Sequence, residues 1–149
     1  MRAFVDTNVL VYAVDRADPE RQAAARALLD SPQYDFVLSA QVLAEFYVVT
    51  TRKLAEPVPE ATAQAMVDAL APLAVVPIDA PLVQTAIGRA RSWGLSLWDA
   101  LILRAAEAGG CEVVLSEDFA ADRTYDGIRV VNPFAETPRP PGSTGPRSP

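Results

Sequence analysis

Short apolar runs that suit β-strands alternate along this chain with longer segments of helical period, and this alternation restricts the fold more than any other feature. The runs that predict strands are residues 2–5, 35–38, 74–78, 112–115 and 128–131. Such an order is typical of a parallel sheet with helices on both faces. Pro77 lies near the end of the third run, which predicts an edge strand there. We therefore expect one α/β domain over residues 1–134, with a central, mostly parallel sheet of four or five strands.

Capping residues mark where the helical segments begin and end. Asp18 stands before a proline, Ser39 and Ser96 each precede a helical pattern, and Gly94 follows one. The expected helices are residues 9–14, 19–30, 39–54, 60–70, 81–93 and 96–108. Residues 122–127 read as a polar loop. Residues 135–149 are rich in proline and carry no large apolar side chain, which predicts a disordered tail.

Four acidic residues follow or interrupt apolar runs. Asp6 ends the first strand, Asp118 follows the fourth, Glu45 interrupts an apolar helix, and Asp99 lies in the first turn of another helix. A carboxylate in apolar surroundings carries a large desolvation cost unless a cation compensates it. No single arginine or lysine lies near all four acids in the sequence. The pattern therefore predicts that the four acids converge in the fold around a divalent metal ion.

The composition narrows the chemistry. The chain has no histidine, which removes the Ser-His-Asp triad, histidine-based nucleases and HExxH zinc enzymes. Its one cysteine, Cys111, excludes an internal disulfide and a multi-cysteine zinc site. An all-oxygen ligand set suits Mg²⁺ or Mn²⁺. The net charge of −6 neither supports nor vetoes an RNA substrate, because neutralising the four acids leaves 13 basic against 15 acidic side chains.

Each acid also has a structural interpretation. Asp6 could cap the helix that follows it, and Asp118 could belong to an ordinary turn, with Glu117 as a competitor for its role. Asp99 completes a Ser96-x-x-Asp99 pattern close to a capping box. Glu45 is the hardest to explain in this way, since an acid in mid-helix has no capping role. The four together favour a functional site more strongly than any one of them.

Other polar and aromatic positions are open to two interpretations. Gln41 lies four residues before Glu45 and shares its helix face, which suggests a polar slot in a buried helix. Arg52 shares that face too, and could reach a phosphate or stabilise the end of the helix. We expect Trp93 and Trp98 to pack in the core or at its rim. The N-terminal apolar run stops at an acid after three residues, unlike a signal peptide, and this favours a cytoplasmic protein.

The motifs around the acids resemble those of the PIN domain family and, within it, the VapC-type toxins of bacterial toxin–antitoxin pairs. The matching segments are Asp6-Thr7-Asn8-Val9-Leu10, Val42-Leu43-Ala44-Glu45-Phe46, Leu97-Trp98-Asp99-Ala100-Leu101-Ile102 and Leu115-Ser116-Glu117-Asp118-Phe119. The resemblance covers nearly the whole chain except the proline-rich tail.

The resemblance implies a ribonuclease that depends on Mg²⁺ or Mn²⁺. It implies that the metal-site acids are Asp6, Glu45, Asp99 and Asp118, and that the supporting polar residues are Asn8 and Ser116. It also implies an RNA substrate, inhibition by a small antitoxin protein, and a homodimer.

Three other interpretations compete with a nuclease. A haloacid-dehalogenase-like phosphatase also opens with a strand and an aspartate, but it needs a second aspartate where this chain has Asn8, and a lysine other than Lys53. A receiver domain needs a lysine late in the chain, and none is present. The third alternative is a PIN-fold module that binds RNA or protein without cutting.

Overall fold

Six strands form one sheet in the order β3-β2-β1-β4-β6-β5 in the computed structural model, which describes residues 1–119 and 123–135. The strands are β1 (Arg2–Val5), β2 (Asp35–Ser39), β3 (Ala74–Val76), β4 (Val113–Leu115), β5 (Thr124–Tyr125) and β6 (Ile128–Val131). Every pair is parallel except β5–β6. This confirms the predicted α/β class, and β3 is an edge strand as Pro77 indicated.

The sheet has six strands, where four or five were expected. The extra strand, β5, lies in the segment predicted as a polar loop and pairs with β6 as an antiparallel hairpin. Asp126 and Gly127 make its turn, and both have positive φ angles, of 47° and 87°. Positive φ at both central residues is typical of the two-residue Asp-Gly turn, so the sequence did contain the signal for this hairpin.

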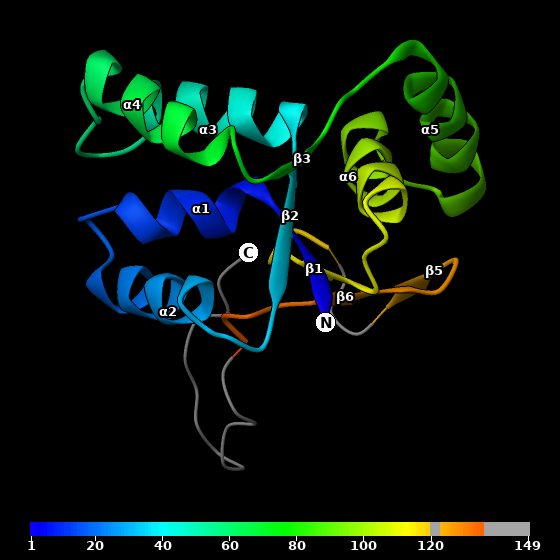
Figure 1. Cartoon of the computed structure of the whole chain (residues 1–149), viewed down its shortest axis with the longest axis horizontal. Helices are drawn as coiled ribbons and strands as arrows, with labels where there is room; N and C mark the ends of the chain where they lie inside the picture. Colours follow the sequence, from blue (N-terminus) through cyan, green and yellow to red (C-terminus); the bar gives the residue numbers. More distant parts are fainter. Residues whose placement is uncertain (120–122, 136–149) are drawn as a thin grey trace.

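Among the described residues, six helices cover the two faces of the sheet. They are α1 (Thr7–Val14), α2 (Pro19–Leu29), α3 (Ala40–Arg52), α4 (Glu60–Leu70), α5 (Ala80–Trp93) and α6 (Leu97–Ala108). Figure 1 shows α1 to α4 on one side of the strands and α5 and α6 on the other. Helix α1 begins two residues earlier than expected because Asp6 is itself the N-cap. Within the described residues, no helix is long and apolar enough to cross a membrane.

The core lies against the two central strands. Ala3, Phe4 and Val5 of β1 have no exposed surface, and neither does Val114 of β4. Each large apolar side chain buried in this way contributes roughly 1.5–3 kcal/mol. A Cβ added at Gly109 would lie 2.7 Å from Cγ1 of Val37, so the end of α6 rests directly on β2. The sheet and α6 are thus held in a fixed relation.

The order of the strands reverses between β1 and β4. From β1 the chain extends the sheet towards β2 and β3, whereas β6 and β5 lie on the other side of β4. The N–H of Asp6 donates to the carbonyl of Leu115 at 3.0 Å, and the N–H of Ser116 donates to the carbonyl of Val131 at 3.0 Å. The residues that follow β1 and β4 therefore meet at one edge of the sheet, at the kind of point where parallel sheets bind their ligands.

The predicted disordered tail over residues 135–149 lies outside the described residues except for Ala135. The boundary of the domain at residue 134 stays a prediction.

Candidate functional site

Asp6 links β1 to α1 and is buried, with 5% of its surface exposed. Its Oδ1 accepts from the N–H of Thr7 at 2.7 Å, and its Oδ2 accepts from Oγ of Ser116 at 2.7 Å. The capping role considered for Asp6 is therefore real, but it uses only one of the two carboxylate oxygens. Burial raises the pKa of Asp6 to about 6, against the lowering effect of these two hydrogen bonds, and the charges of Asp118 and Glu45 raise it further.

Ser116 joins the ends of the two central strands. Besides donating to Asp6, its Oγ accepts from Nδ2 of Asn8 at 3.2 Å and from the N–H of Asp118 at 3.1 Å. Nδ2 of Asn8 also donates to Oδ2 of Asp118 at 3.0 Å. These four residues form one hydrogen-bonded network, in which Ser116 is fully buried and Asp118 is exposed. Asn8 and Ser116 thus contact the predicted acids.

Glu45 reaches the same place from α3. Its Oε2 accepts from Oγ1 of Thr7 at 2.6 Å, and its Oε1 accepts from Nε2 of Gln41 at 2.8 Å. The same Nε2 lies 3.4 Å from the carbonyl oxygen of Trp98 at the start of α6. The sequence indicated Gln41 through its spacing from Glu45. Thr7 lies within the Asp6-Thr7-Asn8 motif, but its role was not predicted, because its hydroxyl acts across 38 positions in the chain.

Asp99 lies in the first turn of α6, where Oγ of Ser96 accepts from its N–H at 3.1 Å. The reciprocal bond from the N–H of Ser96 to the carboxylate, which would complete a capping box, does not occur in the described part of the chain. Burial raises the pKa of Asp99, the Ser96 hydroxyl lowers it, and the charges of Asp118 and Glu45 raise it. Capping by Ser96 therefore accounts for the main-chain N–H of Asp99, but it gives no role to the carboxylate of Asp99.

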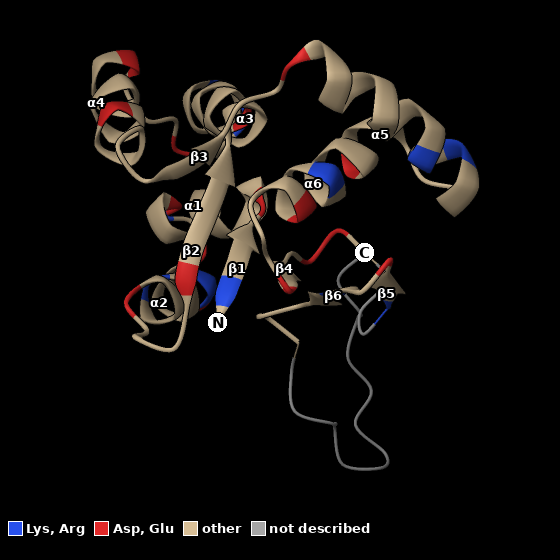
Figure 2. Ribbon diagram, turned by 45° about the vertical axis from the view of Figure 1, so that its right-hand side comes forward, with Lys and Arg blue, Asp and Glu red and all other residues tan. Residues whose placement is uncertain are grey.

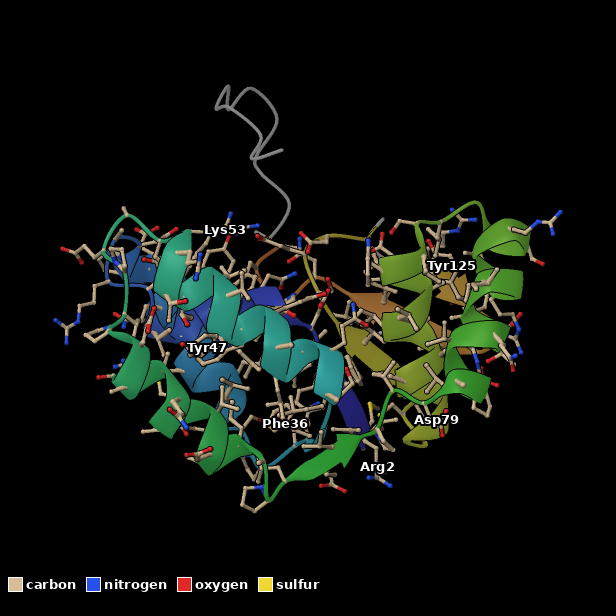
Figure 3. All side chains as sticks on the ribbon, turned by 90° about the horizontal axis from the view of Figure 1, so that it is seen from above. Arg2, Phe36, Tyr47, Lys53, Asp79 and Tyr125 are labelled. Carbon is tan, nitrogen blue, oxygen red and sulfur yellow. The ribbon has the colours of Figure 1, made fainter. Side chains whose placement is uncertain are left out.

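We define the acid cluster as Asp6, Glu45, Asp99 and Asp118, and no basic side chain of the described residues forms an ion pair with it. Asp118 and Glu45 raise the pKa of both other acids, so the charges act on one another as a group. Seen from above in Figure 3, α3 and α4 lie on one side of the strand ends and α5 and α6 on the other.

Glu117 belongs to a different group of side chains. It accepts hydrogen bonds from the hydroxyl of Tyr12 and from the guanidinium of Arg21, with which it also forms an ion pair. The guanidinium of Arg21 lies over the rings of Tyr12 and Phe134, at 5.0 and 5.6 Å from their centroids. We call Tyr12, Arg21, Glu117 and Phe134 the Arg21 cluster. Of the two neighbouring acids, Asp118 therefore contacts the network of Asp6, and Glu117 does not.

Arg52 lies in the last turn of α3, seven residues beyond Glu45. That spacing corresponds to about 10 Å along the helix axis. Figure 3 shows the next residue, Lys53, at the end of α3 that lies away from α5 and α6. The predicted contact of Arg52 with substrate stays a prediction.

The donor atoms at the site fit a hydrated divalent ion better than a closed cage. In the described ranges, no three acidic, histidine or cysteine side chains stand close enough together to hold an ion by themselves. Oδ1 of Asn8 and Oε1 of Gln41 are buried and have no hydrogen-bond partner. Mg²⁺ takes few protein oxygens and keeps several waters, so a few carboxylates and an amide oxygen are a suitable set.

A cavity of about 680 Å³ lies elsewhere, between β3, the start of α5 and the end of α6. Arg2 and Asp79, which Figure 3 labels beside β3, line it, and none of the four acids does. In Figure 2 the acidic segment that follows β4 lies below α6. The acids thus belong to the edge of the sheet and not to this cavity.

A comparison with known protein families finds a match over most of the chain. The model of the PIN domain matches residues 3–127. No curated protein sequence shows a significant match.

Three solved structures share the fold. VapC20 of Mycobacterium tuberculosis, described as a sarcin-ricin loop cleaving toxin, is 20% identical with a TM-score of 0.61, over 78% of this chain and 89% of that one. A toxin–antitoxin complex from Klebsiella pneumoniae is 20% identical with a TM-score of 0.66, over 89% and 98%. VapBC2 of Rickettsia felis, bound to a DNA fragment from its promoter, is 19% identical with a TM-score of 0.57, over 87% and 97%.

Proposed function

The chain belongs to the PIN domain family, and from this premise we propose that it is an endoribonuclease that depends on Mg²⁺ or Mn²⁺ and acts as the toxin of a toxin–antitoxin pair. The observation that carries the proposal is the acid cluster, whose charges act on one another and form no ion pair within the described residues. Two carboxylates about 4 Å apart repel by roughly 4 kcal/mol at an effective dielectric of 20, and a divalent cation reverses the sign of that energy. Metal-dependent hydrolysis needs such a site.

The residues of the site divide into holders of the ion and residues that position the holders. Asp6, Glu45, Asp99 and Asp118 would hold it. When bound, the ion supplies a Lewis acid that activates water and offsets the charge of the phosphodiester. Binding also couples to protonation, because burial and the neighbouring acids raise the pKa of Asp6 to about 6 and a cation lowers it again.

Four polar side chains position the carboxylates. Ser116 orients Oδ2 of Asp6, and Asn8 orients Oδ2 of Asp118. Thr7 and Gln41 hold the two oxygens of Glu45. Such partners typically change metal affinity or activity by 10- to 100-fold when they are removed.

The proposed partners follow from the family and from its solved relatives. The Klebsiella structure is a toxin–antitoxin complex, and VapC20 is described as a toxin that cleaves the sarcin-ricin loop. We infer that this chain cuts RNA, that a small antitoxin protein inhibits it, and that it forms a homodimer in the cytoplasm.

Cleavage of a structured RNA by the purified protein tests the proposal. We expect cleavage with Mg²⁺ or Mn²⁺, none with chelator, and none from Asp6→Asn under either condition. Glu117→Gln is the matched control, since it removes one acidic charge beside the site without touching the acid cluster. Cleavage that persists in chelator, or in Asp6→Asn, would contradict the proposal. Tight RNA binding without cleavage in any condition would establish the non-catalytic module instead.

Sequencing the 5′ ends of RNA from cells that express the protein identifies the target. We expect cuts at defined positions in the wild type and none with Asp6→Asn. Co-expression of a small protein encoded beside this gene should suppress the cuts and co-purify with the chain. Cuts that such a partner leaves unchanged would contradict the toxin–antitoxin assignment but not the nuclease.

A further inference from the structure

Trp98 is the most exposed of the large apolar residues that the structure describes, with 64% of its surface open to solvent. It belongs to neither apolar cluster of the described residues. Trp93, five positions earlier, packs against the core and makes an edge contact with Tyr125 at 5.7 Å between ring centroids. The packing expected of both tryptophans is therefore confirmed for Trp93 and wrong for Trp98, whose exposed indole needs another explanation.

The main chain at Trp98 is tied to the acid cluster. Trp98 directly precedes Asp99, so their Cα atoms lie about 3.8 Å apart. Nε2 of Gln41 lies 3.4 Å from the carbonyl oxygen of Trp98 and 2.8 Å from Oε1 of Glu45. One amide group thus fixes the position of this main-chain segment relative to two of the four acids. The main chain of Trp98 thus lies beside the acid cluster, and most of the residue is open to solvent.

We propose that Trp98 stacks on an unpaired base of the RNA beside the phosphate at the acid cluster. This inference rests on the proposed nuclease function. The acid cluster repels phosphates until an ion is bound, so affinity must come partly from contacts that do not depend on charge. Every base has a flat face that an aromatic ring can cover, and unpaired bases in loops are the ones that proteins reach in this way.

The surroundings of Trp98 suit a base better than a protein partner. A protein interface has a contiguous apolar centre. The other exposed large apolar side chains lie on different elements: Met1 at the N-terminus, Val48 on α3, Leu73 before β3 and Ile87 on α5. Its direct neighbours in the chain do not extend an apolar surface: Leu97 packs against the apolar cluster of α5 and α6, and Asp99 is acidic. One isolated ring beside a catalytic site fits one nucleotide.

Steady-state cleavage of a short single-stranded RNA tests the stacking. Trp98→Ala should raise KM about 10- to 100-fold, with a much smaller change in kcat, because base stacking contributes to binding. Trp98→Phe, which keeps a ring, should restore most of the loss. Trp98→Leu keeps apolar area without a ring and should behave like Trp98→Ala. Equal KM values for the Phe and Leu variants, or an unchanged KM for Trp98→Ala, would overturn the proposal.

Fluorescence separates this proposal from the nuclease itself. Trp93→Phe leaves Trp98 as the only tryptophan in the chain. We expect a single-stranded oligonucleotide to quench its emission in the presence of Ca²⁺, and the same sequence in a duplex to quench it far less. Equal quenching by both would overturn the proposal while leaving the nuclease intact. A wild type that cuts no RNA yet shows strand-selective quenching would contradict the nuclease and leave the stacking standing.

An interface with protein predicts a different pattern. Loss of dimer or of antitoxin binding in Trp98→Ala, with unchanged KM for RNA, would assign the indole to a protein contact and refute the stacking. Circular dichroism of each variant shows whether it is folded.

Discussion

Glu117 and Asp118 are neighbours in the chain, yet they belong to two clusters with opposite electrostatics. Glu117 faces the guanidinium of Arg21 and the hydroxyl of Tyr12, so its charge is compensated. Asp118 receives one side-chain hydrogen bond, from Asn8, and faces other acids. The Arg21 cluster holds the loop after β4 in place, whereas the acid cluster keeps unfavourable charges together. The contrast separates a carboxylate that stabilises the fold from one that the proposed reaction would use.

The largest expected effect comes from replacing Asp118 with its amide, compared with the same replacement at Glu117. Asp118→Asn should lower kcat/KM about 100- to 1,000-fold, because it removes a charge that the proposed ion needs, with little change in stability. Glu117→Gln should leave kcat/KM nearly unchanged and lower the free energy of unfolding by about 1 kcal/mol, since its ion pair is partly exposed. RNA cleavage and urea denaturation measure both. A loss of activity equal in the two variants would remove the distinction between the clusters.

In the metal-free protein, the unfavourable charge in the acid cluster should make the free energy of unfolding depend on pH. The folded pKa of Asp6 is about 6, above its ordinary value of 3.8. The stabilisation from its protonated form is therefore complete below pH 3.8 and is lost as the pH rises through 6. At pH 7 the charged form costs about 3 kcal/mol, as an upper estimate.

Asp6→Asn isolates that cost. In chelator, the free energy of unfolding of Asp6→Asn should exceed that of the wild type by a margin that grows between pH 4 and pH 7. Glu117→Gln should show no such margin. A margin that shrinks as the pH rises would contradict the assignment of the uncompensated charge to Asp6.

Adding Mg²⁺ should stabilise the protein through the acid cluster and leave the contribution of the Arg21 cluster unchanged. At pH 7.5, Mg²⁺ at 100 times its dissociation constant should stabilise the wild type by about 2.7 kcal/mol. Glu117→Gln should gain as much, and Asp99→Asn should gain much less because it lacks one holder of the ion. Thermal unfolding with increasing Mg²⁺ measures this. Equal gains in all three proteins would place the ion elsewhere.

The smallest expected effects come from the hydroxyl groups that support each cluster. Ser116→Ala should lower activity about 10- to 100-fold, because Asp6 loses its donor and Asn8 an acceptor. Tyr12→Phe removes a hydroxyl that donates to Glu117, and should cost about 1 kcal/mol of stability with activity retained. The two variants should be compared by RNA cleavage and urea denaturation. The opposite pattern, with activity lost only in Tyr12→Phe, would show that the Arg21 cluster takes part in the reaction.

Local patterns in the sequence predict much of the fold. The apolar runs locate five of the six strands, and Pro77 identifies the edge strand. The Asp-Gly turn at residues 126–127 was also a local signal, but the segment is short and polar and reads as a loop. The topology brings Asp6 and Asp118 together, since parallel strands present their ends at the same edge.

The remaining contacts depend on pairs that are distant in the chain. Arg21 meets Glu117 across 96 positions, and Thr7 meets Glu45 across 38. No local pattern shows whether Glu117 or Asp118 points towards the acid cluster, because a shift of one residue along the chain would exchange the two. The exposure of Trp98 is equally hidden, since apolar residues on a helix are expected to be buried.

The hydrogen bonds at the ends of β1 and β4 have a consequence for how such a protein is silenced. The amide protons of Asp6 and Ser116 are held by the carbonyls of Leu115 and Val131, inside the most enclosed part of the sheet. We expect their exchange with solvent to require opening of the whole molecule, so the ends of β1 and β4 beside the acid cluster stay in place as long as the chain is folded. Local unfolding would then leave the proposed nuclease assembled. On the proposed function, control would have to come from a molecule that covers the acids or from the supply of the ion.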